Sequence, residues 1–419
     1  MTEVQTTPEA QQAAPRGPPA QQTMQTGPFF ARVRPFAILS KLMATFPVHN
    51  VLTNDGRQLK HRWLSITLIY DLVVYAVVIS FFVYNALKLI EAVRGHDDKF
   101  YLIIWLWFTF IAAGLRNFVQ FTLCHVSARN YPQLFEAIEV YYSGIGAEVV
   151  ERRRDVLRMQ TIPIARVITF LVILIASSYS FFIQFNSEFT WSASMSYVLV
   201  NLWKELPMSM FICLCAHLRQ RFKRLIEELA ACRNSGADDA PAVKRLENLR
   251  LQYAALTNIL GRMEKCFGMQ IAANTLFLVL DCIIQLFIFF VYTSADNVFL
   301  LTLAIYFFVA ACGFVFHVDR LQRKAELLLD ELNAFELEGK SINLKYQVKL
   351  FTAQISARPI KVSASGFCIV NNTLVAGLFG AIATYLIVML NSSQYILAWA
   401  NDTISTRRAQ LNPRYVHLT

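Results

Sequence analysis

The sequence predicts an all-α membrane protein with seven spanning helices, and three observations support this class. The chain of 419 residues is 55% hydrophobic and only 16% charged, whereas soluble proteins carry charges on roughly 25% of their residues. Its apolar residues form runs that reach the ~20 residues needed to cross a bilayer as a helix. Its basic residues lie mostly between these runs. The net charge of +10 therefore indicates membrane topology rather than nucleic-acid binding.

Seven apolar runs are the expected spans, and no internal repeat of the kind found in inverted-repeat transporters relates them. The spans are expected at Trp63–Ile90, Phe100–Leu123, Thr161–Phe185, Thr190–Leu218, Cys266–Tyr292, Asn297–Phe316 and Ser365–Leu390.

The distribution of Lys and Arg sets the expected orientation. Thirty of the 39 basic residues lie before the first span or after the even-numbered spans, and six lie on the other side. The positive-inside rule then places the N terminus in the cytoplasm and the C terminus outside the cell. Two glycosylation sequons, at Asn391 and Asn401, follow the last span on the side expected to be external. We expect Asn401 to be the better sugar acceptor, and residues 391–419 to form an extracellular tail.

The expected cytoplasmic segments differ in character. Residues 1–62 should form a tail whose first 28 or so residues are disordered, because they are rich in Gln, Pro and Thr. Residues 219–265 and 317–361 instead carry apolar residues at helical spacing among charges. They are expected to extend the fourth, fifth and sixth spans into a cytoplasmic helical anchor bundle, with a short helix before the last span. The alternative is that these helices lie on the lipid surface.

The last span contains polar residues that a lipid-facing helix would not need. Asn371, Asn372, Thr373 and Thr384 interrupt its apolar sequence, and an amide or hydroxyl in hydrocarbon costs free energy unless it finds a partner or water. This span is therefore expected to be an inner helix and a candidate pore lining.

The end of this span resembles the closing signature of the insect gustatory receptors, within the insect chemoreceptor superfamily. That signature is Thr-Tyr, five hydrophobic residues, Gln and Phe; here it reads Thr384-Tyr385-Leu386-Ile387-Val388-Met389-Leu390-Asn391-Ser392. The resemblance implies a tetrameric, ligand-gated, non-selective cation channel in the plasma membrane, opened by an external small-molecule tastant. It also implies that the last helices of four subunits surround the pore, and that the cytoplasmic helices hold the subunits together.

The resemblance assigns roles at the pore, and the sequence departs from the family at two positions. Val388 would supply the hydrophobic constriction, Asn391 a polar ring and Ser392 the outer gate position, with Thr384 and Ile387 nearby. Asn391 replaces Gln, and Ser392 replaces a large apolar residue. A hydroxyl is poorly suited to closing a pore by dewetting. Val388 would then close the pore alone, the pore would leak, or gating would move to Ile387 or Leu390.

Charged residues inside the spans are candidates for functional roles, because a charge in the membrane is costly unless paired. Arg116 and Lys204 are expected to snorkel or to pair with an acid on another helix, whereas the partners of Asp71 and Asp281, both expected near mid-membrane, are open. The intramembrane charges are Asp71, Arg116, Lys204, Glu205 and Asp281.

A ligand pocket in the outer halves of the spans would combine aromatic contact area with hydrogen-bonding groups. The alternative for each aromatic residue is the interfacial belt. The best candidates for ligand contact are Trp105, Tyr179, Tyr197, Asn201 and Gln285.

No motif of an enzyme, a metal site or a cofactor site is present in the sequence. Two functional alternatives to a self-sufficient channel stay open. The chain could signal through a cytoplasmic partner without a pore of its own, or it could be an obligate subunit that assembles with a related receptor.

Overall fold

The computed structural model describes residues 29–62, 65–94, 100–144, 161, 164–165, 167–173, 175–176, 190–234, 239–291 and 298–411. Within these ranges the regular structure is helical, apart from two isolated bridges that pair His49 with Lys60 and Ser363 with Ile369. The elements are α1 (Phe29–Leu42), η1 (Gly56–Gln58), α2 (Ile66–Arg94), α3 (Phe100–Ser127), η3 (Ala128–Asn130), α4 (Tyr131–Ser143), α6 (Thr190–Asn234), α7 (Asp239–Val291), α8 (Val298–Asn333), α9 (Ile342–Ala357) and α10 (Asn372–Leu411).

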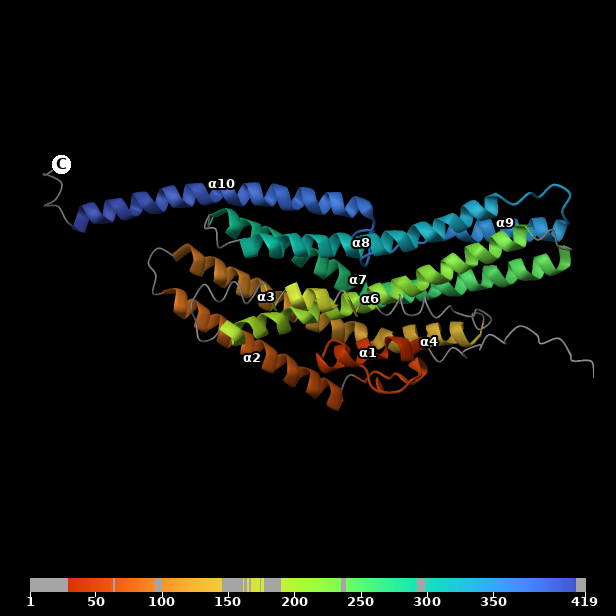
Figure 1. Ribbon diagram of the computed structural model, residues 1–419, viewed down its shortest axis with the longest axis horizontal. Helices are drawn as coiled ribbons and strands as arrows, with labels where there is room; N and C mark the ends of the chain where they lie inside the picture. Colours follow the sequence, from red (N-terminus) through yellow and green to blue (C-terminus); the bar gives the residue numbers. More distant parts are fainter. Residues whose placement is uncertain are drawn as a thin grey trace, which may run out of the picture.

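Three long helices organise the molecule. In Figure 1 α6, α7 and α8 run lengthwise through the molecule, with α2, α3 and α10 beside their left parts and α1, α4 and α9 beside their right parts, and α10 projects to the left beyond them. We call the left part of the molecule the span half and the right part the anchor half. Each long helix passes from one half into the other without interruption, so the apolar runs and the charged segments that adjoin them form single helices.

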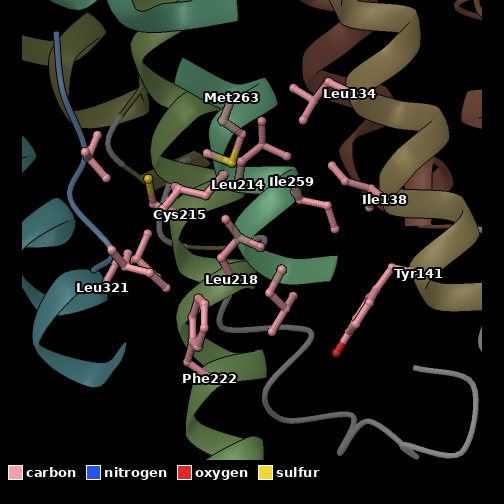
Figure 2. Close-up of a cluster of buried hydrophobic side chains, with 14 of the residues drawn as sticks. Leu134, Ile138, Tyr141, Leu214, Cys215, Leu218, Phe222, Ile259, Met263 and Leu321 are labelled. Carbon is pink, nitrogen blue, oxygen red and sulfur yellow. The ribbon is translucent and has the colours of Figure 1, made fainter. Parts of the chain in front are cut away.

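The anchor half holds the main core. Aromatic rings from three helices meet there. The ring centre of Tyr253 on α7 lies 6.1 Å from that of Phe222 on α6 and 5.7 Å from that of Phe351 on α9. Figure 2 shows the neighbouring part of this core, in which side chains of α4, α6 and α7 point toward one another. Helices α4 and α9 therefore bury their apolar faces against the ends of the long helices, as amphipathic helices do.

Helix α1 is fixed to α4 at its first residues. The backbone N–H groups of Phe29 and Phe30 donate hydrogen bonds to the carboxylate of Glu139, at 3.1 and 2.6 Å. A carboxylate at a helix N terminus satisfies donors that have no partner within the helix. Burial raises the pKa of Glu139 above its ordinary value, and the bonds from Phe30 and Phe29 oppose that shift. Part of the expected N-terminal tail is thus packed structure.

Five helices in the described part of the chain are long and apolar enough to cross a membrane. They correspond to the first, fourth, fifth, sixth and seventh expected spans. The second expected span is helix α3, and the third, Thr161–Phe185, lies largely outside the described residues.

The last helix differs from its expected bounds. It begins at Asn372 rather than Ser365, and it continues to Leu411 instead of ending at Leu390. Ser365 and Gly366 have φ values of 52° and 86°, in the left-handed region that a right-handed helix excludes. The Ser-Gly pair is therefore a turn before the helix, and more than half of the expected tail is helical.

Candidate gating and ligand-binding sites

The five residues proposed for the gate are exposed on α10. Thr384, Ile387, Val388 and Asn391 follow one another at the three- and four-residue spacing that places side chains on one face of a helix. The opposite face carries Ile382, which is buried, and Met389, and it packs on a cluster from α6, α7 and α8. Helix α10 thus presents one face to its own subunit and the gate residues to the outside of the subunit.

Ser392 differs from the other gate residues. It lies about 100° further round the helix than Asn391, at the edge of the exposed stripe. Its hydroxyl donates a hydrogen bond of 2.8 Å to the carbonyl oxygen of Val388. Because the hydroxyl proton is used in this bond within the helix, Ser392 has no free hydrogen-bond donor in its side chain to present to a pore.

The segment that leads into α10 is held by α8. In this segment, residues 358–371, the N–H of Val370 donates to the carbonyl of Val362 at 2.9 Å. The side-chain amide of Gln322 on α8 binds the other two backbone groups of Val362 and Val370. Its Nε2 donates to the Val370 carbonyl at 2.6 Å, and its Oε1 accepts from the Val362 N–H at 3.3 Å. At the first residue of α10, Asn372 Nδ2 donates to Asp319 of α8 at 3.0 Å.

The same segment is held on its other side by α7. Glu264 accepts a hydrogen bond of 2.6 Å from the N–H of Ser363. Gly268, one turn further along α7, lies so close to Ser365 that a Cβ added to it would be 2.6 Å from the Ser365 hydroxyl and 2.9 Å from its backbone nitrogen. We call these contacts of Glu264, Gly268, Asp319 and Gln322 the α10 clamp.

A buried charge cluster joins three helices in the span half. Arg116 of α3 lies 2.5 Å from Asp281 of α7 and donates a second hydrogen bond of 3.1 Å to Asn201 of α6. The ammonium of Lys204, also on α6, lies 3.8 Å from Asp281 and 4.0 Å from the ring centre of Phe307. The partners of Asp281 are therefore Arg116 and Lys204, which pair with it rather than reach the membrane surface. Glu205 is buried beside them.

Asp71 belongs to a second cluster, near the start of α2 rather than in its middle. Its buried carboxylate lies 3.4 Å from Lys41 of α1 and 3.4 Å from the His125 ring of α3. Burial lowers the pKa of Lys41, and the neighbouring Asp71 opposes that shift. This cluster ties α1 of the anchor half to two helices of the span half.

The candidate ligand contacts are only partly described. Asn201 and Gln285 are buried, and the Asn201 carbonyl oxygen is engaged by Arg116. The side chains of Trp105 and Tyr197, on α3 and α6, lie outside the described residues, as does all of Tyr179. Among the sequons, Asn391 is exposed within α10, and the side chain of Asn401 is not described.

The sequence did not single out the residues of the α10 clamp. Gln322 and Glu264 lie in charged helical segments, where a polar residue normally indicates a solvated face, and their role depends on a loop that is distant along the chain. Asn274 was also missed, although a carboxamide inside the run Cys266–Tyr292 is the same signal that drew attention to the last span.

Comparisons with known proteins agree with this architecture. The family model described as 7tm Chemosensory receptor matches residues 33–396. No curated protein matches the chain by sequence.

Two solved structures share the fold. The insect olfactory receptor OR5 from Machilis hrabei in complex with eugenol is 12% identical, with a TM-score of 0.59, over 87% of this chain and 99% of that one. A second structure of the insect olfactory receptor OR5 from Machilis hrabei is 13% identical, with a TM-score of 0.60, over 85% of this chain and 97% of that one.

These matches confirm the expected all-α fold and the resemblance to insect chemoreceptors. The family comprises receptors rather than enzymes, in agreement with the lack of catalytic motifs. With a family model that spans residues 33–396, the chain belongs to the seven-transmembrane chemosensory receptor family.

Proposed function

We propose that this receptor is of the gustatory type and forms a tetrameric, non-selective cation channel in the plasma membrane, opened by an external small molecule. The observation that carries the proposal is the exposure of α10. Within Asn372–Ser392, only 11% of the 18 most apolar consecutive residues are buried inside one subunit. The exposed face includes Thr384 and Asn391, and hydrogen-bonding groups on a lipid-facing surface are costly. A water-filled pore shared by four copies would solvate these groups.

In this proposal Val388 forms the barrier. It is 54% exposed in one subunit and lies on the stripe between Thr384 and Asn391. A ring of four such side chains can close a narrow pore by dewetting. Ser392 would add less polarity to the barrier than a free hydroxyl, because it donates to the Val388 carbonyl. This hydrogen bond supports a closed resting pore despite the departure from the gustatory signature.

Recording current from cells that express the full chain alone tests the proposal. A panel of tastants should evoke cation current, and Val388→Ala should increase the current without ligand. The matched control is Val140→Ala on α4, whose side chain is equally exposed, at 55%, but lies in the anchor half. The proposal fails if Val388→Ala, at equal surface expression, changes neither the basal nor the evoked current.

Three further outcomes test the orientation and separate the alternatives. Silence of the chain alone, with current when a related receptor is coexpressed, would assign it the role of an obligate subunit. An N-terminal tag that antibodies reach on intact cells would contradict the proposed orientation. If tastants elicit a cytoplasmic response without any current in either expression format, the receptor signals without a pore.

A further inference from the structure

A cavity lies where α6, α7, α8 and α10 meet, next to the charge cluster. Its volume, measured as the space open to the centre of a water molecule, is about 40 Å³. One water needs roughly 10–15 Å³ of cavity, so this space holds several waters or a small organic molecule. The cavity shares Lys204 and Glu205 with the charge cluster but includes none of the residues expected to contact an external ligand. We call it the inner cavity.

Two polar side chains in the wall of the inner cavity have unused hydrogen-bonding capacity. Asn274 of α7 is 7% exposed, and neither its Oδ1 nor its Nδ2 has a hydrogen-bond partner among the described residues. Lys204 is 3% exposed, and its ammonium donates no hydrogen bond there, since Asp281 is 3.8 Å away. Buried polar groups normally find partners. Both groups line the same cavity, so a molecule inside it can supply the missing partners.

Apart from Glu205 and Thr275, the rest of the wall is apolar. Ile271, Leu278, Phe314 and Val315 contribute to it, together with Leu374 and Leu378 of α10. Leu374 and Leu378 are one helical turn apart, just beyond the α10 clamp. An occupant with an apolar body would therefore touch the helix proposed to line the pore.

The local charge favours a neutral occupant. Two cations, Arg116 and Lys204, face two acids, Asp281 and Glu205, so the surroundings carry no net charge to bind an ion. A hydroxyl group matches the two unused side chains, because it provides one donor and two acceptor positions. Its oxygen can accept from the Lys204 ammonium while its proton is donated to Asn274 Oδ1.

We propose that the inner cavity binds a small monohydric alcohol, with its hydroxyl between Lys204 and Asn274 and its apolar body against Phe314, Leu374 and Leu378. This site is separate from the outer ligand pocket expected for the receptor. An alcohol bound there contacts three long helices and α10 at once, so it affects how α10 sits against its own subunit.

Direct binding to the purified full chain in lipid nanodiscs tests the site. The probe is 4,4-difluorocyclohexanol, observed by ¹⁹F NMR, and 1,1-difluorocyclohexane is the matching molecule without a hydroxyl. The alcohol should bind saturably to the wild type. Asn274→Leu keeps the side-chain size but removes both hydrogen-bonding groups, and should weaken alcohol binding about tenfold without weakening the binding of 1,1-difluorocyclohexane.

Asn117→Leu is the matched control. Asn117 is a buried asparagine on α3 that does not line the inner cavity, so its replacement should leave alcohol binding unchanged. Ala311→Phe fills the cavity from α8 and should abolish binding of both molecules, which keeps the test decisive if Asn274→Leu folds poorly.

Three outcomes overturn the proposal. The wild type could show only unsaturable partition, as expected if water alone fills the cavity. Saturable binding could survive both Asn274→Leu and Ala311→Phe, which would place the alcohol elsewhere. Asn274→Leu and Asn117→Leu could weaken binding equally. None of these readouts requires current, so they are independent of whether the receptor is a channel.

Discussion

Helices α6 and α10 are similar in length and both contain an apolar window long enough to span a membrane, but their surroundings within one subunit are opposite. The window of α6 is 89% buried and that of α10 only 11%. The buried helix carries Asn201, Lys204 and Glu205, whereas the apolar side chains of α10 are largely uncovered. α6 is therefore the central element of the subunit, whereas α10 is held to the subunit mainly by the clamp residues of α7 and α8 and by one narrow face.

The largest expected effect tests this contrast with one substitution made on both helices. Phe211 of α6 is 0% exposed and Phe379 of α10 is 63% exposed. Phe211→Ala should lower the free energy of unfolding by about 3–5 kcal/mol because it leaves a cavity in the core. Phe379→Ala should lower it by less than about 1 kcal/mol in a dispersed subunit. Denaturation in mixed micelles measures both, and equal losses would mean that α10 is as well packed as α6.

A somewhat smaller effect tests the polar contacts of α6. Asp281→Leu leaves Arg116 and Lys204 buried without this acid, and should cost about 3 kcal/mol. Adding Arg116→Leu should recover part of the loss, since one uncompensated cation is removed. The control is Glu91→Ala, which breaks the exposed pair with Lys88 and should cost at most about 0.5 kcal/mol. If the double variant is less stable than the single one, Arg116 has a role beyond pairing with Asp281.

The attachment of α10 is tested by two glycines on α7, two turns apart. Gly268→Ala places a Cβ against the backbone of Ser365 and should destabilise the protein by about 1–3 kcal/mol. Gly261→Ala meets nothing within 4 Å and should stabilise it by up to about 1 kcal/mol, because alanine favours helix. Thermal unfolding of both variants should shift in opposite directions. A shift of Gly268→Ala in the stabilising direction would show that the clamp is loose.

The smallest effect concerns α1, which packs on α6 beside His217. The pKa of Glu139 is raised by burial, so the folded state holds its proton more tightly than the unfolded state. Relative to Glu139→Gln, the wild type should lose stability as pH rises from about 4.5 through the raised pKa, and should stay constant above it. Unfolding of both proteins across this pH range measures this loss, and a difference that does not vary with pH would contradict the shift.

The class of fold was predictable from the sequence because it depends on local composition: on the length of the apolar runs and on the basic residues between them. The continuity of α6, α7 and α8 also followed from helical spacing in the segments beyond the spans. The start of α10 was wrong by seven residues, because Ser365 and Gly366 fit an apolar helix by composition but adopt left-handed backbone. A hydropathy pattern does not contain that information.

The candidate sites show a similar limit. Asp281 was identified as a charge that needs a partner, but its partners Arg116 and Lys204 lie on other helices, and one sequence does not reveal which helices adjoin. The α10 clamp was missed for the same reason, since Gln322 acts on a segment some 40 residues further along the chain.

The bond pattern of Gln322 has a mechanical consequence. Its amide holds Val362 and Val370 together, so it fastens the incoming and the outgoing strand of the loop to a single point on α8. Asn372, the first residue of α10, is bound to Asp319 on the same helix. Both sides of the loop and the start of α10 are therefore attached to one helix, α8, less than one and a half turns apart.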